Sequence, residues 1–209
     1  MPKVVDHEER RGRLVEAVWE LTVREGLEGV TLRKVAAEAG VSMGQVQHYY
    51  ASMRELIRDA FTRAQRSVDA KVRASIESAA PADSAASAAS TAPEAILRTC
   101  LHALLARDEE TSRLVLLSVA GLGRAVSDPR LAEVFAPQDD SLREFTASLL
   151  TEARRERGTE GEEFDALTEA DICWSLAESL ATDVALGLRT PESAERLMTH
   201  HIDGTLTRT

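Results

Sequence analysis

The chain has 209 residues, of which 44% are apolar and 29% are charged, and its formal net charge is −10. This composition is ordinary for a folded soluble protein. The sequence holds no run of about 18 uncharged apolar residues, which excludes a membrane-spanning helix. Its first stretch, MPKVVDHEERRGR, lacks the apolar core of a signal peptide, so we expect a cytoplasmic protein.

The N-terminal quarter of the chain predicts three helices. The first should span residues 6 to 25, where apolar residues recur at helical spacing, and Gly26 suits its end. Thr31 is a suitable N-cap for a second, short helix. A tight turn then leads to Ser42, which forms an S-x-x-Q capping box with Gln45 and so predicts the start of a third helix.

The rest of the chain predicts further helices and no strands. Residues 79–93 are low-complexity Ala, Ser and Pro, typical of a loop, and residues 158–166 form an acidic loop. Pro137 should kink or interrupt the helix that contains it. The six further helices are expected at 52–78, 94–107, 110–126, 128–157, 168–188 and from Thr190 onward. The sequence therefore predicts an all-α fold of about nine helices.

The two cysteines, Cys100 and Cys173, each lie within an apolar helical pattern. Because no export signal precedes them, we expect two reduced and buried thiols. A redox pair is the alternative, but the sequence contains no C-x-x-C motif that would favour it.

Residues 31–50, TLRKVAAEAGVSMGQVQHYY, predict two short helices joined by a tight turn, which is the pattern of a helix-turn-helix DNA reader. Val46 should point into the core, so that the polar residues of the third helix face outward. Glutamine can pair with adenine, Met43 can pack on a thymine methyl, and Gly44 permits close approach to the groove. The residues expected near base edges are Ser42, Met43, Gly44, Gln45, Gln47 and His48.

Residues 7–67 resemble the DNA-binding domain of the TetR family of transcriptional regulators. The stretch that carries the resemblance is GVTLRKVAAEAGVSMGQVQHYYASMREL, in which the helix starts match those of the family. The resemblance implies an N-terminal three-helix helix-turn-helix domain at 7–67. It also implies a larger helical domain at 68–209 that binds a ligand and dimerises. Within the first domain, it implies that Tyr50 packs into the core.

The resemblance also assigns DNA contacts outside the third helix. Tyr49 would donate to a phosphate, and Thr31 and Arg33 would touch the DNA backbone. Many members of the family carry a phosphate-binding lysine where this chain has Met53. Because a methionine cannot make that contact, we expect Arg54 to substitute for it.

The charge of the chain is unevenly distributed. Residues 1–60 contain 9 Lys/Arg and 10 Asp/Glu, whereas residues 61–209 contain 16 and 25. Within 31–58 there are four Lys/Arg and two Asp/Glu, so the local excess of positive charge is small. Since DNA affinity depends largely on phosphate neutralisation, we expect modest affinity per reading head and a homodimer with two heads on a palindromic DNA operator.

The last two helices are the expected dimer surface. Helix 168–188 carries apolar residues on more than one side, and small alanines would let a partner helix approach closely. The resemblance implies a four-helix bundle across a two-fold axis. A core helix within one chain is the alternative. The candidate interface residues are Ala177, Ala181, Ala185, Leu188, Leu197 and His201.

A ligand pocket is expected among the helices of the C-terminal domain. Trp174 with a neighbouring acid would favour a cationic or amphipathic molecule. Each candidate could equally be an ordinary core residue. The candidate lining residues are His102, Leu117, Gly121, Phe145, Trp174 and Glu178.

These patterns predict a homodimeric repressor that a small apolar or amphipathic effector releases from its operator by a population shift. The alternative is a DNA-binding regulator, an activator or partner-controlled protein, with no small-molecule effector. An enzyme is not expected, because the sequence has neither a G-x-S-x-G nor a P-loop motif. No cofactor and no metal are expected either, because the adjacent His200 and His201 would face different sides of a helix.

Overall fold

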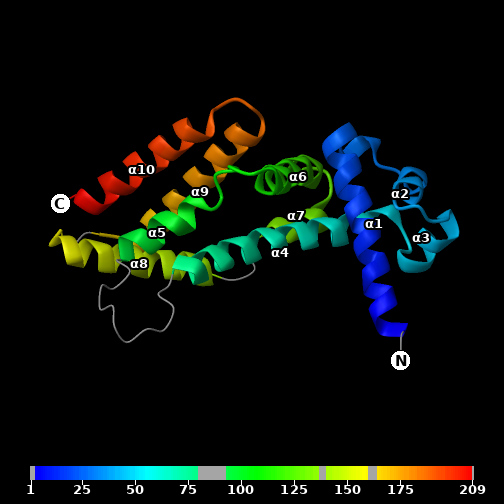
Figure 1. The fold of residues 1–209 in the computed structure, drawn as a ribbon, viewed down its shortest axis with the longest axis horizontal. Helices are drawn as coiled ribbons and strands as arrows, with labels where there is room; N and C mark the ends of the chain where they lie inside the picture. Colours follow the sequence, from blue (N-terminus) through cyan, green and yellow to red (C-terminus); the bar gives the residue numbers. More distant parts are fainter. Residues whose placement is uncertain (1–2, 80–92, 137–139, 160–163, 209) are drawn as a thin grey trace. The chain divides into compact units, whose positions relative to one another are not determined.

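We describe the chain from a computed structural model, which covers residues 3–79, 93–136, 140–159 and 164–208 (Figure 1). These residues form ten α-helices and one short 3-10 helix, and they contain no strand, which confirms the all-α fold. The elements are α1 (Lys3–Glu25), η1 (Leu27–Gly29), α2 (Leu32–Glu38), α3 (Met43–Tyr49), α4 (Met53–Ala79), α5 (Pro93–His102), α6 (Glu109–Ala125), α7 (Pro129–Phe135), α8 (Ser141–Arg157), α9 (Ala166–Ala185) and α10 (Pro191–Thr207).

The described residues contain one α-helix more than the sequence predicted, because the expected helix at 128–157 is two helices, α7 and α8. Helix α7 ends at Phe135, and Ala136 has an extended backbone with a ψ of 141°. A residue that precedes a proline is pushed out of the helical region by the proline ring, so Pro137 accounts for this end. Pro137 itself and part of the acidic loop lie outside the described residues, as do residues 80–92 of the loop expected at 79–93, whose end residues Ala79 and Pro93 belong to α4 and α5.

The described residues fall into two compact units. The first unit comprises those within Met1–Ser67 and Leu116–Ala136, and the second comprises those within Val68–Val115 and Pro137–Thr209. The sequence-based division also cut the chain after residue 67, but it placed the segment 116–136 with the C-terminal domain. In the structure this segment packs with the N-terminal helices.

The first unit is built around the apolar face of α1. Leu14, Val18 and Leu21 are at most 2% exposed, as the helical spacing of these residues predicts. The indole Nε1 of Trp19 donates a hydrogen bond of 2.9 Å to the carbonyl of Ala60, which fixes α1 against α4. The long α4 therefore forms part of the same core as the shorter helices.

The second unit has a core made by α5, α8, α9 and α10. Cys100 and Cys173 are free and buried in this core, which confirms the expected buried thiols. Burial raises the pKa of each thiol to about 12. Arg154 is also buried, and its guanidinium donates to the carbonyl of Thr205 at 2.7 Å, so α8 is tied to α10 by a satisfied buried charge. No helix among the described residues is long and apolar enough to cross a lipid bilayer.

Candidate nucleic-acid interface

Local hydrogen bonds fix the two short helices α2 and α3 and the turn between them. The Thr31 hydroxyl accepts from the backbone N–H of Lys34 at 3.3 Å, which confirms the predicted cap of α2. Gly40 in the turn has a φ of +65°, a conformation that glycine adopts without strain. At the start of α3, the Ser42 hydroxyl accepts from the N–H of Gln45 at 3.3 Å, and the Gln45 Oε1 accepts from the N–H of Ser42 at 2.9 Å. The predicted capping box is therefore present.

Helix α3 has one buried side and one exposed side. Val46 and Tyr50 are at most 1% exposed, and they anchor the helix in the first unit. The capping box engages the carbonyl oxygen of Gln45 and orients its side chain, so of its polar atoms only the amide nitrogen is not used in the cap. The residues on the exposed side are the predicted readers Ser42, Met43, Gly44, Gln45, Gln47 and His48.

Gly44 lies on the exposed side of α3. A Cβ at this position would meet only the Ser42 hydroxyl, at 4.0 Å, so packing within the chain does not require a glycine. Glycine in a helix interior costs roughly 0.5–1 kcal/mol relative to alanine. The position therefore gives up helix stability and leaves the outer surface of α3 without a side chain there.

A partly buried polar cluster holds the end of α3 against α1 and α4. The Tyr50 hydroxyl donates to Asp59 at 2.6 Å, and Arg63 donates to the other carboxylate oxygen of Asp59 at 3.3 Å. The Arg11 guanidinium carbon lies 4.7 Å from the centre of the Tyr50 ring. Burial alone would raise the pKa of Asp59, but the hydrogen bonds from Tyr50 and Arg63 lower it below its usual value. The carboxylate is thus charged and partnered, and it fixes the orientation of α3.

The end of α3 also carries a group of three rings. Tyr49 is partly exposed, and its ring centre lies 5.5 Å from that of His7 on α1 and 5.2 Å from that of His48. These edge-on contacts restrain the Tyr49 side chain without using its hydroxyl. His7 was not among the predicted site residues, because no local pattern connects residue 7 with residue 49.

The positive charges around the helix-turn-helix differ in their availability. Lys34 is paired with Glu25 at 2.6 Å, whereas Arg33 is exposed and makes no ion pair within the described residues. Met53 is half-buried, and the neighbouring Arg54 is exposed but lies 3.6 Å from Asp128. The phosphate contact expected of Arg54 stays a prediction, and the structure adds an acidic partner, Asp128, that the sequence pattern did not indicate.

The six residues predicted to line a ligand pocket do not share a described cavity. Leu117 is buried in the first unit, and a Cβ on Gly121 would overlap the ring of Phe135, so these two residues are packed core. Trp174 donates to the Thr146 hydroxyl at 3.1 Å and packs against the core of the second unit. A sequence pattern cannot distinguish such residues from the lining of a cavity, since both are apolar and helical.

The remaining three pocket candidates lie apart in the second unit. His102 lines a cavity of about 530 Å³, together with Lys71, Arg98 and Arg107. Phe145 lines a different cavity of about 330 Å³. Glu178 is exposed on α9.

The structure corrects part of the predicted dimer surface. Ala177 and Ala181 are at most 2% exposed, because α9 packs on α8 and α10 of its own chain. These two alanines therefore face the core of one chain and not a second copy. In contrast, Leu188 is 74% and Leu197 is 40% exposed, and Ala185 and His201 are partly exposed. The sequence reasoning did not include Leu186 and Ile172, which are also exposed.

Comparisons with known proteins agree with this architecture. A family model described as "Bacterial regulatory proteins, tetR family" matches residues 14–60. A second, described as "BetI-type transcriptional repressor, C-terminal", matches residues 93–207, which is more than half of the chain.

Curated relatives match over part of their length. The chain is 38% identical over 73 residues to the HTH-type transcriptional regulator PksA of Bacillus subtilis, a match that spans 35% of this chain and 36% of the relative. It is 39% identical over 85 residues to the HTH-type transcriptional regulator BetI of Paraburkholderia phymatum, which spans 35% of this chain and 43% of the relative. These matches therefore cover less than half of the curated proteins.

A solved structure matches over nearly the whole chain. It is a transcriptional regulator from Rhodococcus sp. Rha1, which superposes with a TM-score of 0.72 at 27% identity and covers 94% of this chain and 95% of its own. Together with the capped helix-turn-helix and the family matches at residues 14–60 and 93–207, this likeness settles the family. The chain belongs to the TetR family of bacterial transcriptional regulators, and its C-terminal region is of the BetI type.

Proposed function

We propose that the chain is a homodimeric repressor that reads a palindromic operator through α3 and releases it when a small molecule binds. The observation that carries the DNA-binding half of this proposal is the division of α3 into two sides. Val46 is fully buried, while Gln47 and the residues around it are exposed on a short helix whose start is capped. An exposed helix face is ordinarily polar, and here its glutamines, histidine and short side chains are of the kind that base-edge recognition in the major groove requires.

Gln47 is the residue that we expect to read a base most directly. Bidentate pairing with adenine uses both the carbonyl and the amide of a glutamine. Gln45 has already committed its carbonyl oxygen to the cap, whereas Gln47 makes no hydrogen bond within the described part of the chain. Tyr49 and Arg33 are expected to contact phosphates on either side.

The exposed leucines of the second unit support the homodimer. Leu186 and Leu188 follow α9, and Leu197 lies on α10; each is at least 40% exposed. Large apolar side chains gathered at one pair of helices mark a protein–protein contact. We therefore propose that α9 and α10 pair with the same helices of a second copy, and that the two heads bind two operator half-sites.

The effector proposal rests on the second unit. The family description of residues 93–207 names a transcriptional repressor, and the cavity of about 530 Å³ beside His102 has the size of a ligand site. Lys71, Arg98 and Arg107 line it with a single acid, Asp108, which pairs with Lys71 at 2.8 Å. Because the positive charges outnumber the negative one, an amphipathic molecule with an acidic group fits the cavity better than the cationic molecule that Trp174 had suggested. Helix α4 contributes residues to both units and is the element through which we expect a ligand to act.

The DNA-binding proposal is tested with operator fragments selected from random DNA by the purified protein. Gln47→Ala should weaken operator binding in gel-shift titrations by roughly 10- to 100-fold, equivalent to about 1–3 kcal/mol. Tyr49→Phe should weaken it less. Loss of Gln47 should also relax the preference at one base pair. Both variants should sediment as the wild-type dimer. Unchanged operator affinity in both variants would remove α3 from the interface.

The effector proposal has a distinct alternative, a regulator without a small-molecule ligand. A thermal-shift screen separates the two, because a ligand that binds only the folded protein raises the melting temperature. A compound that raises it and also releases the operator supports the effector, and Arg107→Ala should reduce both effects. A screen of acidic amphipathic compounds in which none does both would favour the alternative.

A further inference from the structure

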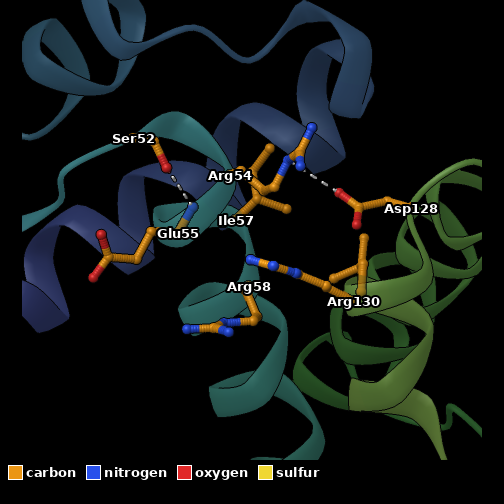
Figure 2. A pocket seen from close by; sticks show the side chains of 8 residues that line it. Ser52, Arg54, Glu55, Ile57, Arg58, Asp128 and Arg130 are labelled. Carbon is orange, nitrogen blue, oxygen red and sulfur yellow. Dashed lines mark hydrogen bonds and ion pairs between the residues drawn. The ribbon is translucent and has the colours of Figure 1, made fainter.

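The first unit contains a pocket of about 260 Å³ between the start of α4 and the start of α7 (Figure 2). Three arginines line it: Arg54 and Arg58 from α4, and Arg130 from α7. In Figure 2 the Arg130 side chain extends from α7 toward α4. We call this the arginine pocket. The pocket is formed by two segments that are about 70 residues apart in sequence, so no local motif predicts it.

The acidic residues at the arginine pocket are already engaged. Asp128 lies 3.6 Å from Arg54, and its side chain is only 13% exposed. Glu55 accepts the backbone N–H of Ala51 at 2.9 Å, as part of the cap of α4. The guanidinium groups of Arg58 and Arg130 make no hydrogen bond or ion pair within the part of the chain that the structure describes. Two guanidinium groups therefore line one pocket without a carboxylate of their own.

The chemistry of the pocket favours an oxyanion. Like charges that line one cavity repel each other unless an anion lies between them. Guanidinium groups present paired N–H donors that match the oxygens of a phosphate group. The wall of the pocket includes Leu131, which is 2% exposed, and the half-buried Ile57, and apolar walls strengthen an ion pair relative to bulk water. The volume is ample for a phosphate group.

We infer that the arginine pocket binds a phosphate-type oxyanion, held by Arg58 and Arg130, with Arg54 shared between the anion and Asp128. The anion is either a backbone phosphate of DNA or the phosphate of a free small molecule. Only the first source rests on the proposed operator binding. In either case the pocket lies next to Arg54, so its occupation is coupled to a residue that we expect at the DNA.

Inorganic phosphate, compared with chloride at equal ionic strength, is the probe for the free anion. The full-length wild type should show a phosphate-dependent rise in melting temperature, and Arg58→Ala and Arg130→Ala should bind phosphate at least about tenfold more weakly. Arg66→Ala is the matched control, because Arg66 is an exposed arginine on the same helix outside the arginine pocket. It should respond as the wild type does. An equal rise in all four proteins would overturn the inference.

The selected operator fragment is the probe for DNA phosphate. If the backbone occupies the pocket, Arg130→Ala should weaken binding at every sequence alike and reduce the slope of log affinity against log salt by about 0.9, while Arg66→Ala should not. Loss of phosphate binding with unchanged operator binding identifies a free ligand instead. The inference fails if neither Arg58→Ala nor Arg130→Ala alters phosphate binding or operator binding. A chain that binds no DNA at all would refute the proposed function, and the phosphate titration would still decide this site.

Discussion

Two glycines of this chain show that the same residue type can have opposite structural roles. Gly44 has open space around it, so its missing side chain leaves room for the close approach of DNA that we expect at α3. Gly121 on α6 is instead enclosed by Phe61 and Phe135, and a Cβ there would come within 2.8 Å of the Phe61 ring. Sequence reasoning placed Gly121 in a ligand pocket, because a glycine in an apolar helix fits a cavity and a tight packing contact equally well. Only the partner helices distinguish the two.

Gly121→Ala should destabilise the protein for this reason. Phe61 is 1% exposed and cannot move aside freely, so the new methyl group is expected to cost roughly 1–3 kcal/mol of unfolding free energy. Gly123→Ala is the matched control on the same helix, since a Cβ at 123 meets nothing within 4 Å. It should gain roughly 0.5–1 kcal/mol, because alanine favours a helix. Urea denaturation measures both, and a stabilised Gly121→Ala variant would contradict the packing described.

At the scale of elements, α3 is a helix that depends on its surroundings for stability. It has only seven residues, so its stability comes from its caps and from burial of Val46 and Tyr50. The hydroxyl of Ser42 and the side chain of Gln45 satisfy backbone groups at its start. The element that we expect to read DNA is thus held in place by the residues at its own ends.

Two substitutions at Ser42 separate its structural role from its proposed DNA contact. Ser42→Ala removes the cap and should lower the unfolding free energy by about 1 kcal/mol. Ser42→Asp keeps a capping oxygen and should retain stability, but its negative charge should weaken operator binding by repelling phosphates. Denaturation and gel-shift titration on both variants check this. If Ser42→Asp binds the operator as tightly as the wild type does, Ser42 does not face DNA.

The elements also show what the sequence could predict. Capping residues and helical spacing determine where helices begin and which face is apolar, so Thr31, Ser42 and Val46 were assigned correctly. At the start of α4, the Ser52 hydroxyl accepts from the N–H of Glu55 at 3.2 Å, and the Glu55 carboxylate accepts from the N–H of Ala51 at 2.9 Å. What sequence reasoning missed depends on pairing between distant helices. The contact of Tyr50 with Asp59, the pairing of Arg54 with Asp128, and the burial of Ala177 all belong to this class.

At the scale of the whole molecule, two partly buried histidines are expected to make the stability of the second unit dependent on pH. His102 on α5 faces Glu195 at 3.9 Å, with Arg98 and Arg107 nearby, and His201 on α10 faces Glu169, Arg208 and His200. Burial is the main cause that lowers the pKa of both imidazoles below the usual 6.5, since the nearby Glu195 and Glu169 only partly oppose it. The Nε2 atom of each is buried without a hydrogen-bond partner in the described residues. Burial therefore favours the neutral form of both imidazoles in the folded protein.

The sign of the effect follows from proton linkage. As the pH falls below about 6.5, the unfolded chain takes up protons on these histidines before the folded chain does, so the free energy of unfolding decreases. Denaturation of the wild type at fixed protein concentration should show this loss between pH 7 and pH 5, in addition to the contribution of carboxylates at lower pH. The double variant His102→Gln/His201→Gln should lose less stability over the same interval. His7→Gln, which alters an exposed histidine of the first unit, should follow the wild type. A double variant whose stability falls as steeply as that of the wild type would show that these two imidazoles are not the groups responsible.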